Sequence, residues 1–267
     1  MLRVDLSPPD FIHVPQAPRI ERRTFCERNA RNQWHMWTAG SVTESGERLG
    51  LSNHTWSHLD APFHLLEDGA PFERLDPHQY LALDARLVDL TRTGPARRET
   101  VDGVNYHTRI DVDDLPADLT GFEAVLFVTG FAALYPTRYP MKPGADAHYP
   151  HISGEAARRL ASIPGLRVAG IDGPSVDKPE TNAEAHRVLL GRRPTPVLLL
   201  ETLTFERLRS HVPTLPARVL LTIEPLRAFG HQADGALSSV FAYAPTPGQE
   251  AQFAAFSAAM RGAILIA

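Results

Sequence analysis

Five short apolar runs separated by turn signals constrain the fold of this 267-residue chain more than any other feature. Each run has only four or five residues, and glycine, proline or acidic residues follow several of them. Runs of this kind are typical of strands buried on both faces of a sheet, although periodicity alone does not exclude buried helix. The expected strands are 87–90, 124–128, 168–171, 197–200 and 219–223.

Helical signals lie between and after these runs. Ser153 is a suitable N-cap for a helix over 154–161. The segment 246–249 has the residues of a capping box, with proline at the first helical position, and predicts a helix over about 247–262. An apolar stripe on that helix is expected to pack in the core or between subunits; it consists of Phe253, Phe256 and Met260.

The alternation of strands and helices predicts an α/β fold, a single domain over 1–267 with a mixed β-sheet and flanking helices. The prolines between residues 8 and 18 predict an irregular N-terminal arm over 1–20. Hydrophobic residues make up 43% and charged residues 22% of the chain, as in an ordinary globular enzyme.

Charge and cysteine content narrow the class of protein. The formal net charge of -4 argues against nonspecific nucleic-acid binding. Cys26 is the single cysteine, so an intrachain disulfide and a cysteine-based zinc ribbon are excluded. The first residues lack the apolar run of a signal peptide, and no apolar stretch is long enough to cross a bilayer. We therefore expect a cytoplasmic protein that does not associate with membranes.

The run HTWSHLDAPFH, residues 54–64, carries three histidines and an aspartate within eleven residues. Thr, Trp and Ser are weak helix formers, and Pro62 blocks helix continuation, so we expect a strand or an extended loop. Side chains alternate along such a segment, which would place four residues on one face: His54, Trp56, His58 and Asp60.

Imidazole and carboxylate are the ligands of a catalytic divalent metal. A single histidine is more often a surface residue or a hydrogen-bonded core residue, but three histidines and an aspartate at these positions favour a metal site. Zinc is the first expectation, and manganese stays open because the set includes an oxygen ligand.

Other polar residues carry weaker signals. Asp172, Ser175 and Asp177 follow an apolar strand, and we interpret them as turn residues that could also support a site. The segment 135–151 lacks a regular pattern, and a lid over a site and a plain surface connection are equally good interpretations. Aromatic and histidine residues that could reach a pocket, but more often only pack, are Trp34, Trp37, His148 and His151.

The run at 54–64 resembles the signature His-x-Gly-Thr-His-x-Asp-x-Pro-x-His of the metal-dependent cyclase/hydrolase family, which includes bacterial kynurenine formamidase and isatin hydrolase. Trp56 stands where that family usually has glycine, and Ser57 where it usually has threonine. The resemblance covers roughly residues 45 to 245, and three further segments carry it: VLFVTGF (125–131), GIDGPSVD (170–177) and DGA (234–236).

The resemblance implies an α/β fold, a homodimer or higher homo-oligomer, and one or two divalent metal ions per chain. It assigns His54, His58 and Asp60 to a first ion. It assigns Asp60, His186 and Glu201 to a second ion, with Asp60 bridging the two.

His64 is assigned as the catalytic acid and base, because an imidazole of near-neutral pKa suits proton transfer. The alternatives for His64 are a further metal ligand or a residue that supports a ligand. Trp56 is expected to contact the substrate and to narrow the pocket, so that the preferred substrate differs from an open aryl formamide.

Three functions follow as hypotheses. The first is hydrolysis of a non-peptide amide bond in a small aromatic or cyclic molecule such as N-formylkynurenine or a related aryl formamide. The second is another reaction on the same metal site, either opening of a lactam or lactone ring or a dehydrating cyclisation. The third is a noncatalytic metal-dependent binding protein, which His64 disfavours because a structural site needs no proton shuttle.

Overall fold

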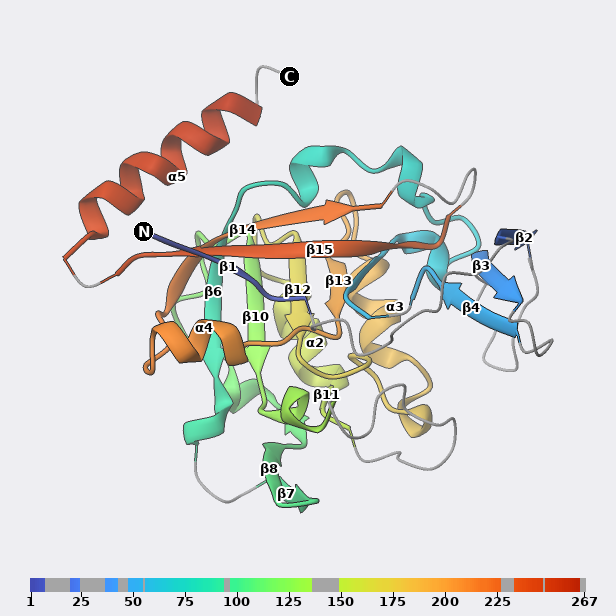
Figure 1. The fold of residues 1–267 in the computed structure, drawn as a ribbon, viewed down its shortest axis with the longest axis horizontal. Coiled ribbons are helices and arrows are strands. Elements are labelled where there is room, and N and C mark those ends of the chain that lie inside the picture. The colour runs from blue at the N-terminus through green and yellow to red at the C-terminus, as the bar shows by residue number, and fades with distance from the viewer. Residues whose placement is uncertain are drawn as a thin grey trace.

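An eight-stranded mixed sheet forms the centre of the computed structural model, which describes residues 1–7, 20–24, 37–42, 48–54, 56–93, 97–135, 149–226, 233–246 and 248–264 (Figure 1). The five expected strands and the mixed α/β fold are confirmed. The strands lie in the order β1-β15-β14-β6-β10-β12-β13-β5. Their bounds are β1 (Leu2–Asp5), β5 (His58–Asp60), β6 (Leu83–Asp89), β10 (Ala124–Val128), β12 (Val168–Ile171), β13 (Leu198–Glu201), β14 (Arg218–Pro225) and β15 (Gly235–Ala244).

Strand β5 closes the sheet into a barrel-like ring. Strands β6, β10, β12 and β13 run parallel to one another, whereas β14, β15 and β5 pair antiparallel with their neighbours. On one edge of β5, Leu59 is opposite Leu200 of β13, and on the other edge it is opposite Ala236 of β15. Strand β1 pairs with the far end of the same long strand, β15.

Both faces of the central strands are buried, which explains why their sequences are continuously apolar. Leu126 and Leu200 lie in a cluster with residues of β14 and β15. Their neighbours Val125 and Leu199 belong to a second cluster, which includes side chains of two helices. These helices are α2 (Gly154–Ala161) and α3 (Glu184–Leu190).

The N-cap prediction for α2 is confirmed, because the Ser153 side chain accepts a hydrogen bond from the Ala156 amide at 3.2 Å. The last helix, α5 (Glu250–Ile264), begins three residues later than predicted. Gly248 has φ +81°, a left-handed conformation that cannot belong to a right-handed helix, so α5 starts after it. A further short helix, α4 (Glu206–His211), was not predicted.

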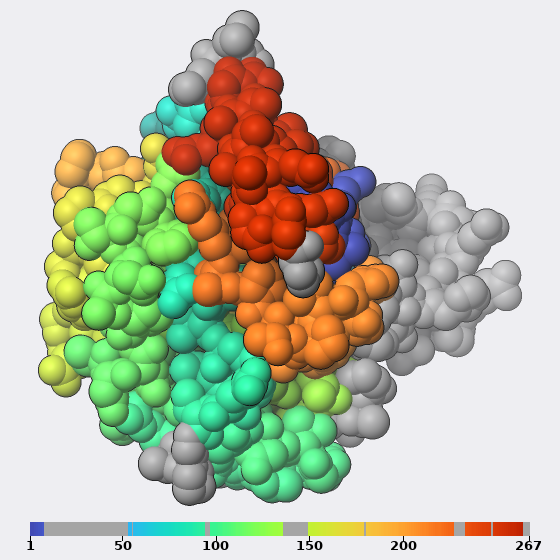
Figure 2. All heavy atoms as spheres, turned by 90° about the vertical axis from the view of Figure 1, so that its left-hand side faces the viewer, coloured from blue at the N-terminus to red at the C-terminus, as the bar shows by residue number. Residues whose placement is uncertain are grey.

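The apolar stripe of α5 packs against the sheet, as expected. Phe253 is buried against Ala82 and Leu220, and two partly buried side chains of the helix, Phe256 and Met260, join this contact. Figure 2 shows α5 on the outside of the molecule. None of the described helices is long and apolar enough to span a membrane.

The prediction of an irregular N-terminal arm was wrong for the first residues of the chain. Leu2 to Asp5 form β1, because Leu2 and Val4 alternate with charged residues and Val4 is buried. Residues 8–19 lie outside the described part. Smaller sheets complete the fold: β2 (Ile20–Thr24), β3 (Trp37–Val42) and β4 (Arg48–Ser52); β7 (Arg98–Val101) and β8 (Val104–His107); β9 (Arg109–Ile110) and β11 (His151–Ile152).

Candidate metal centre and active site

The fold brings the histidines of the 54–64 run together with two residues from the second half of the chain. His58 and Asp60 lie on β5, and Glu201 is the last residue of β13, directly opposite His58 in the ladder. His186 lies on α3, whose side chains pack beside β13. All four side chains are buried.

The backbone of the run differs from the extended segment predicted for it. The strand covers only His58–Asp60, His54 lies in a turn, and Trp56 has φ +56°. The predicted alternation over residues 54–60 is therefore wrong before His58. The left-handed conformation at position 56 disfavours side chains with a Cβ atom, whereas glycine, which stands at this position in the signature that the run resembles, adopts it freely.

Two imidazole nitrogens and two carboxylates converge on one point between β5, β13 and α3. His58 Nε2 lies 3.4 Å from Asp60 Oδ1 and 3.3 Å from Glu201 Oε2. His186 Nε2 lies 3.4 Å from Asp60 Oδ2 and 3.5 Å from Glu201 Oε1. These separations exceed the usual hydrogen-bond range, but donors about 2.1 Å from one tetrahedral cation would lie about 3.4 Å apart. The donor set therefore fits a divalent metal ion.

The hydrogen bonds of the two imidazoles support this fit. His58 Nδ1 donates to the Trp56 carbonyl at 2.7 Å, and His186 Nδ1 donates to Asp177 Oδ2 at 2.7 Å. In the neutral rings each Nε2 then presents a lone pair toward carboxylate oxygens, an arrangement that a cation between them stabilises. Asp60 is fully buried, and neither of its oxygens accepts a well-formed hydrogen bond from the residues that the structure describes.

The Asp177 carboxylate positions His186 by accepting hydrogen bonds from both the backbone and the side chain of that histidine. One carboxylate oxygen accepts from the His186 amide at 2.8 Å, and the other accepts from the Ala185 amide at 3.1 Å. Because Ala183 before α3 provides no side-chain cap, Asp177 caps the helix from outside it. The turn interpretation of Asp177 was thus incomplete, since its carboxylate also orients a candidate metal ligand.

A second group of donors meets Asp60 from the other side. His54 Nδ1 lies 2.8 Å from Asp60 Oδ1, and its Nε2 lies 2.9 Å from Asp234 Oδ2. His64, on the 3-10 helix Pro62–His64, places Nδ1 2.9 Å from the same Asp234 oxygen. Donor atoms of His54, Asp60 and His64 are close enough to hold an ion, as are those of His58, Asp60 and Glu201.

Gly235 allows the close approach of His54 to β15. A Cβ atom built at this glycine would lie only 2.7 Å from His54 Cε1, so a larger residue would displace the imidazole. Asn53 completes this side of the site, because its Nδ2 donates to Asp234 Oδ1 at 2.5 Å.

The electrostatics follow from burial and from these contacts. Burial alone would lower the pKa of His186, but its hydrogen bond with Asp177 and the nearby carboxylates of Asp60 and Glu201 raise it to about 10. Burial and the charge of His54 lower the pKa of His64, although Asp234 favours its protonated form.

The carboxylates respond to the surrounding imidazoles. Burial alone would raise the pKa of Asp60, but His64 and His54 hold it well below its ordinary value. Asp234 is likewise held low by the charge of His54 and its hydrogen bond, against the opposing effect of burial. Both side chains therefore remain carboxylates at neutral pH.

Sequence reasoning gave no role to Asp234 or Asn53. Asp234 follows no apolar run, and its only signal was the DGA segment in the family resemblance. Asp172 has the structural role expected of a turn residue, since its carboxylate accepts hydrogen bonds from Thr129 and Gly130 amides. Trp34, His148 and most of the segment 135–151 lie outside the described residues, as do the side-chain contacts of Trp37.

A mixed, barrel-like α/β domain with a buried cluster of histidines and carboxylates defines the class of protein. The model of the family described as "Putative cyclase" matches residues 4–178. The chain belongs to this family.

Named relatives agree with this membership. The chain is 31% identical to the kynurenine formamidase of Salinibacter ruber over 220 residues, which are 80% of this chain and 89% of that relative. It is 32% identical to the kynurenine formamidase of Geobacillus thermodenitrificans over 175 residues, 65% of this chain and 69% of the relative. The chain is accordingly a hydrolase of the cyclase family.

Solved structures share the fold. A protein described as a potential metal-dependent hydrolase with cyclase activity superimposes with a TM-score of 0.58 at 21% identity, covering 92% of this chain and 99% of the other. Isatin hydrolase A from Ralstonia solanacearum gives a TM-score of 0.58 at 19% identity, covering 90% of this chain and 91% of the other.

Proposed function

We propose that this chain is a metal-dependent hydrolase that cleaves a non-peptide amide bond in a small aromatic or cyclic substrate. The observation that carries the proposal is the buried Asp60 carboxylate, whose oxygens face the Nε2 atoms of His58 and His186 at 3.4 Å without a well-formed hydrogen bond from the described residues. An aryl formamide such as N-formylkynurenine is the first substrate candidate, because relatives about 30% identical are kynurenine formamidases.

The ligands of the metal would be the five residues His54, His58, Asp60, His186 and Glu201. Zinc is the first candidate for the ion and manganese the second, with one or two ions per chain. A bound divalent metal would lower the pKa of water and polarise a carbonyl group. Trp56 and Asp177 fix the orientation of His58 and His186, so that both rings are ready to bind without rearrangement.

His64 is the proposed proton carrier. It lies in the same cluster, with its ring centroid 4.2 Å from that of His54 and 5.7 Å from that of His186. Asp234 accepts a hydrogen bond from its Nδ1, which leaves Nε2 as the atom that takes or gives a proton. The lowered pKa of His64 keeps this nitrogen unprotonated at neutral pH, as a base requires.

Trp56 is the proposed substrate-binding residue. It lines a hollow of about 370 Å³ together with Ser57, Leu237 and Leu226. Because Ser57 immediately precedes the metal ligand His58, this hollow adjoins the ligand-bearing strand. The indole reduces the space in the hollow, which favours a substrate that differs from an open aryl formamide.

Opening of a lactam ring is the second candidate reaction, because isatin hydrolase A has the same fold. A dehydrating cyclisation or a lactone hydrolysis on the same metal would use the same groups. A noncatalytic binding protein is the candidate of another class, and it would take up metal and ligand without turnover.

One experiment separates these candidates. The protein purified without chelators is first analysed for bound metal, and is then assayed with aryl formamides and with lactams, each with added zinc or manganese. Hydrolysis of either substrate that is abolished by Asp60→Asn supports the proposal. Stoichiometric metal without turnover of any substrate would instead favour a binding protein.

The proposal extends to assembly and location. We infer a homodimer in the cytoplasm, bound to a small molecule and not to nucleic acid or membranes. Light scattering of the purified protein tests the assembly, and fractionation of the source cells tests the location.

A further inference from the structure

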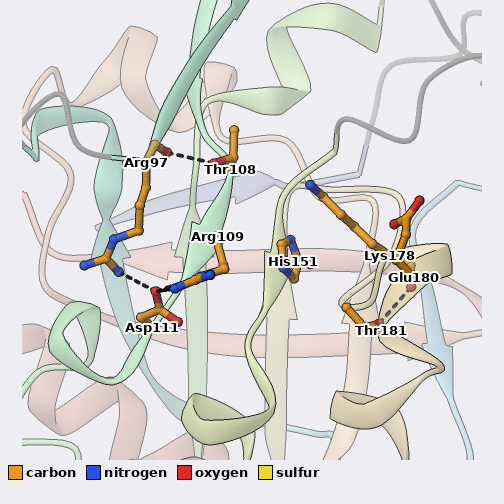
Figure 3. Close-up of a pocket in the computed structure, with 8 residues that line it drawn as sticks. All are labelled: Arg97, Thr108, Arg109, Asp111, His151, Lys178, Glu180 and Thr181. Atoms are coloured by element: carbon orange, nitrogen blue, oxygen red, sulfur yellow. Dashed lines mark hydrogen bonds and ion pairs between the residues drawn. The ribbon is translucent and has the colours of Figure 1, made fainter.

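A second hollow, of about 760 Å³, lies apart from the histidine and carboxylate cluster (Figure 3). Among the described residues that line it there is no residue of the candidate metal centre. Its wall is formed by β9, β11 and the turn that follows Asp177, and the residues that matter for its chemistry are Arg97, Arg109, Asp111, His151, Lys178 and Thr181.

Two cationic groups in this hollow keep hydrogen-bonding capacity. Arg109 contacts a single oxygen of Asp111 through Nε at 2.8 Å and through Nη2 at 2.6 Å, so its Nη1 has no acceptor among the described residues. Lys178 has no ion-pair partner among the described residues. Arg97 is different, because its guanidinium is already bonded to three aspartates of the neighbouring loop.

His151 supplies a buried polar group between these two cations. It is only 8% exposed, and its Nδ1 has no hydrogen-bond partner among the described residues. His151 and Arg109 are direct partners in the parallel pairing of β11 with β9, which places them next to each other. In Figure 3 the imidazole lies between Arg109 and Lys178.

The donors that stay free in the lining favour an anionic ligand. Arg97 is fully paired with aspartates, whereas Lys178 and the Nη1 group of Arg109 have no acceptor among the residues that the structure describes. A guanidinium edge and an ammonium group together match the two oxygens of a carboxylate. We propose that this hollow is a binding site for a small carboxylate, held by Arg109 and Lys178 beside the imidazole of His151.

The turn that carries Lys178 separates this site from the metal centre. Thr181 Oγ1 donates to Asp177 Oδ1 at 2.7 Å, and the other oxygen of Asp177 accepts from His186 Nδ1. His186, Asp177 and Thr181 thus stand in series between the two sites.

The sequence offers a selective probe, because the chain has only two lysines, Lys142 and Lys178. Reductive methylation with ¹³C-formaldehyde keeps their charge and gives NMR signals for these two side chains and the N-terminal amine. In the metal-loaded protein, acetate should shift the Lys178 signal saturably while the other two signals shift little. Lys178→Arg assigns the signal by removing it.

Arg109→Gln is expected to raise the acetate concentration needed for half of the Lys178 shift about tenfold, because the substitution removes a charge-assisted hydrogen bond to the ligand. The matched control is Arg207→Gln, which alters an exposed arginine bonded to Asp5 and should leave the shift unchanged. Equal movement of all three signals, or no movement, would overturn the site. A saturable shift that Arg109→Gln leaves unchanged would also overturn it.

Discussion

The backbone carbonyl of Trp56 accepts a hydrogen bond from His58 Nδ1 at 2.7 Å, so the residue that departs from the family pattern also orients a candidate metal ligand. The left-handed conformation at position 56, φ +56°, accompanies this contact. The backbone and the side chain of Trp56 therefore act on different parts of the site: the carbonyl acts on the metal ligand and the indole on the adjoining hollow.

This separation predicts the effect of Trp56→Gly. Glycine adopts the left-handed conformation readily, so the contact with His58 and the bound metal should be retained. Removal of the indole should raise kcat/KM for an open aryl formamide relative to a lactam by about tenfold or more. Trp56→Ala is the control, because it opens the hollow but keeps a Cβ atom at the strained position. An unchanged substrate ratio in both variants would show that the indole does not face the substrate.

Substitution of His64 tests the proton-carrier role. His64→Gln should lower kcat by a factor of about 10² to 10⁴ and leave the metal content unchanged, because a general acid or base contributes that much to rate. His78→Gln, at a histidine outside the cluster, serves as the control. Loss of metal together with activity would identify His64 as a ligand instead.

Asp177 offers a test of ligand orientation. Asp177→Asn should weaken metal affinity about 10- to 100-fold, because it replaces an acceptor that fixes the His186 tautomer. The affinity is measured by competition with a chromophoric chelator. Asp84→Asn changes another buried carboxylate, one that pairs with Arg218 away from the cluster, and should leave the metal affinity as it was.

Metal binding should release at least one proton at pH 8. In the metal-free protein the pKa of His186 is raised from 6.5 to about 10, so the ring is protonated at this pH and must lose its proton to bind metal. The raised pKa also affects the stability of the metal-free fold. Protonated His186 stabilises that fold fully below about pH 6.5, and this contribution disappears as the pH rises through about 10. Calorimetry in two buffers of different ionisation enthalpy counts the protons, and a count of zero would contradict the raised pKa.

The central strands could be predicted because burial on both faces makes their sequences continuously apolar. Strand β15 could not, since two adjacent serines, the buried Ser238 and the exposed Ser239, interrupt its apolar pattern. Helix α3 was missed for another reason. The helix is capped by Asp177, which lies nine residues before His186 and accepts a hydrogen bond from its amide. No local sequence motif marks a cap at that distance.

The candidate site divides in the same way. The 54–64 run concentrates ligand-type residues in one segment, so composition alone indicated a metal centre. The positions of His186 and Glu201 came from the family resemblance, because no local pattern joins them to Asp60. Asp234 acquires a role only when β15 pairs with β5 and brings its carboxylate to His54 and His64.

The three-residue strand β5 completes the ring by pairing with β13 on one edge and β15 on the other. Two candidate ligands, His58 and Asp60, lie on this strand, and Glu201 lies across the seam on β13. A metal ion bound to these residues would therefore link β5 to β13 and stabilise the closed ring. Without it, we expect the backbone amides of β5 to exchange hydrogen faster, and the freed edges of β13 and β15 to expose unpaired hydrogen-bonding groups that promote aggregation.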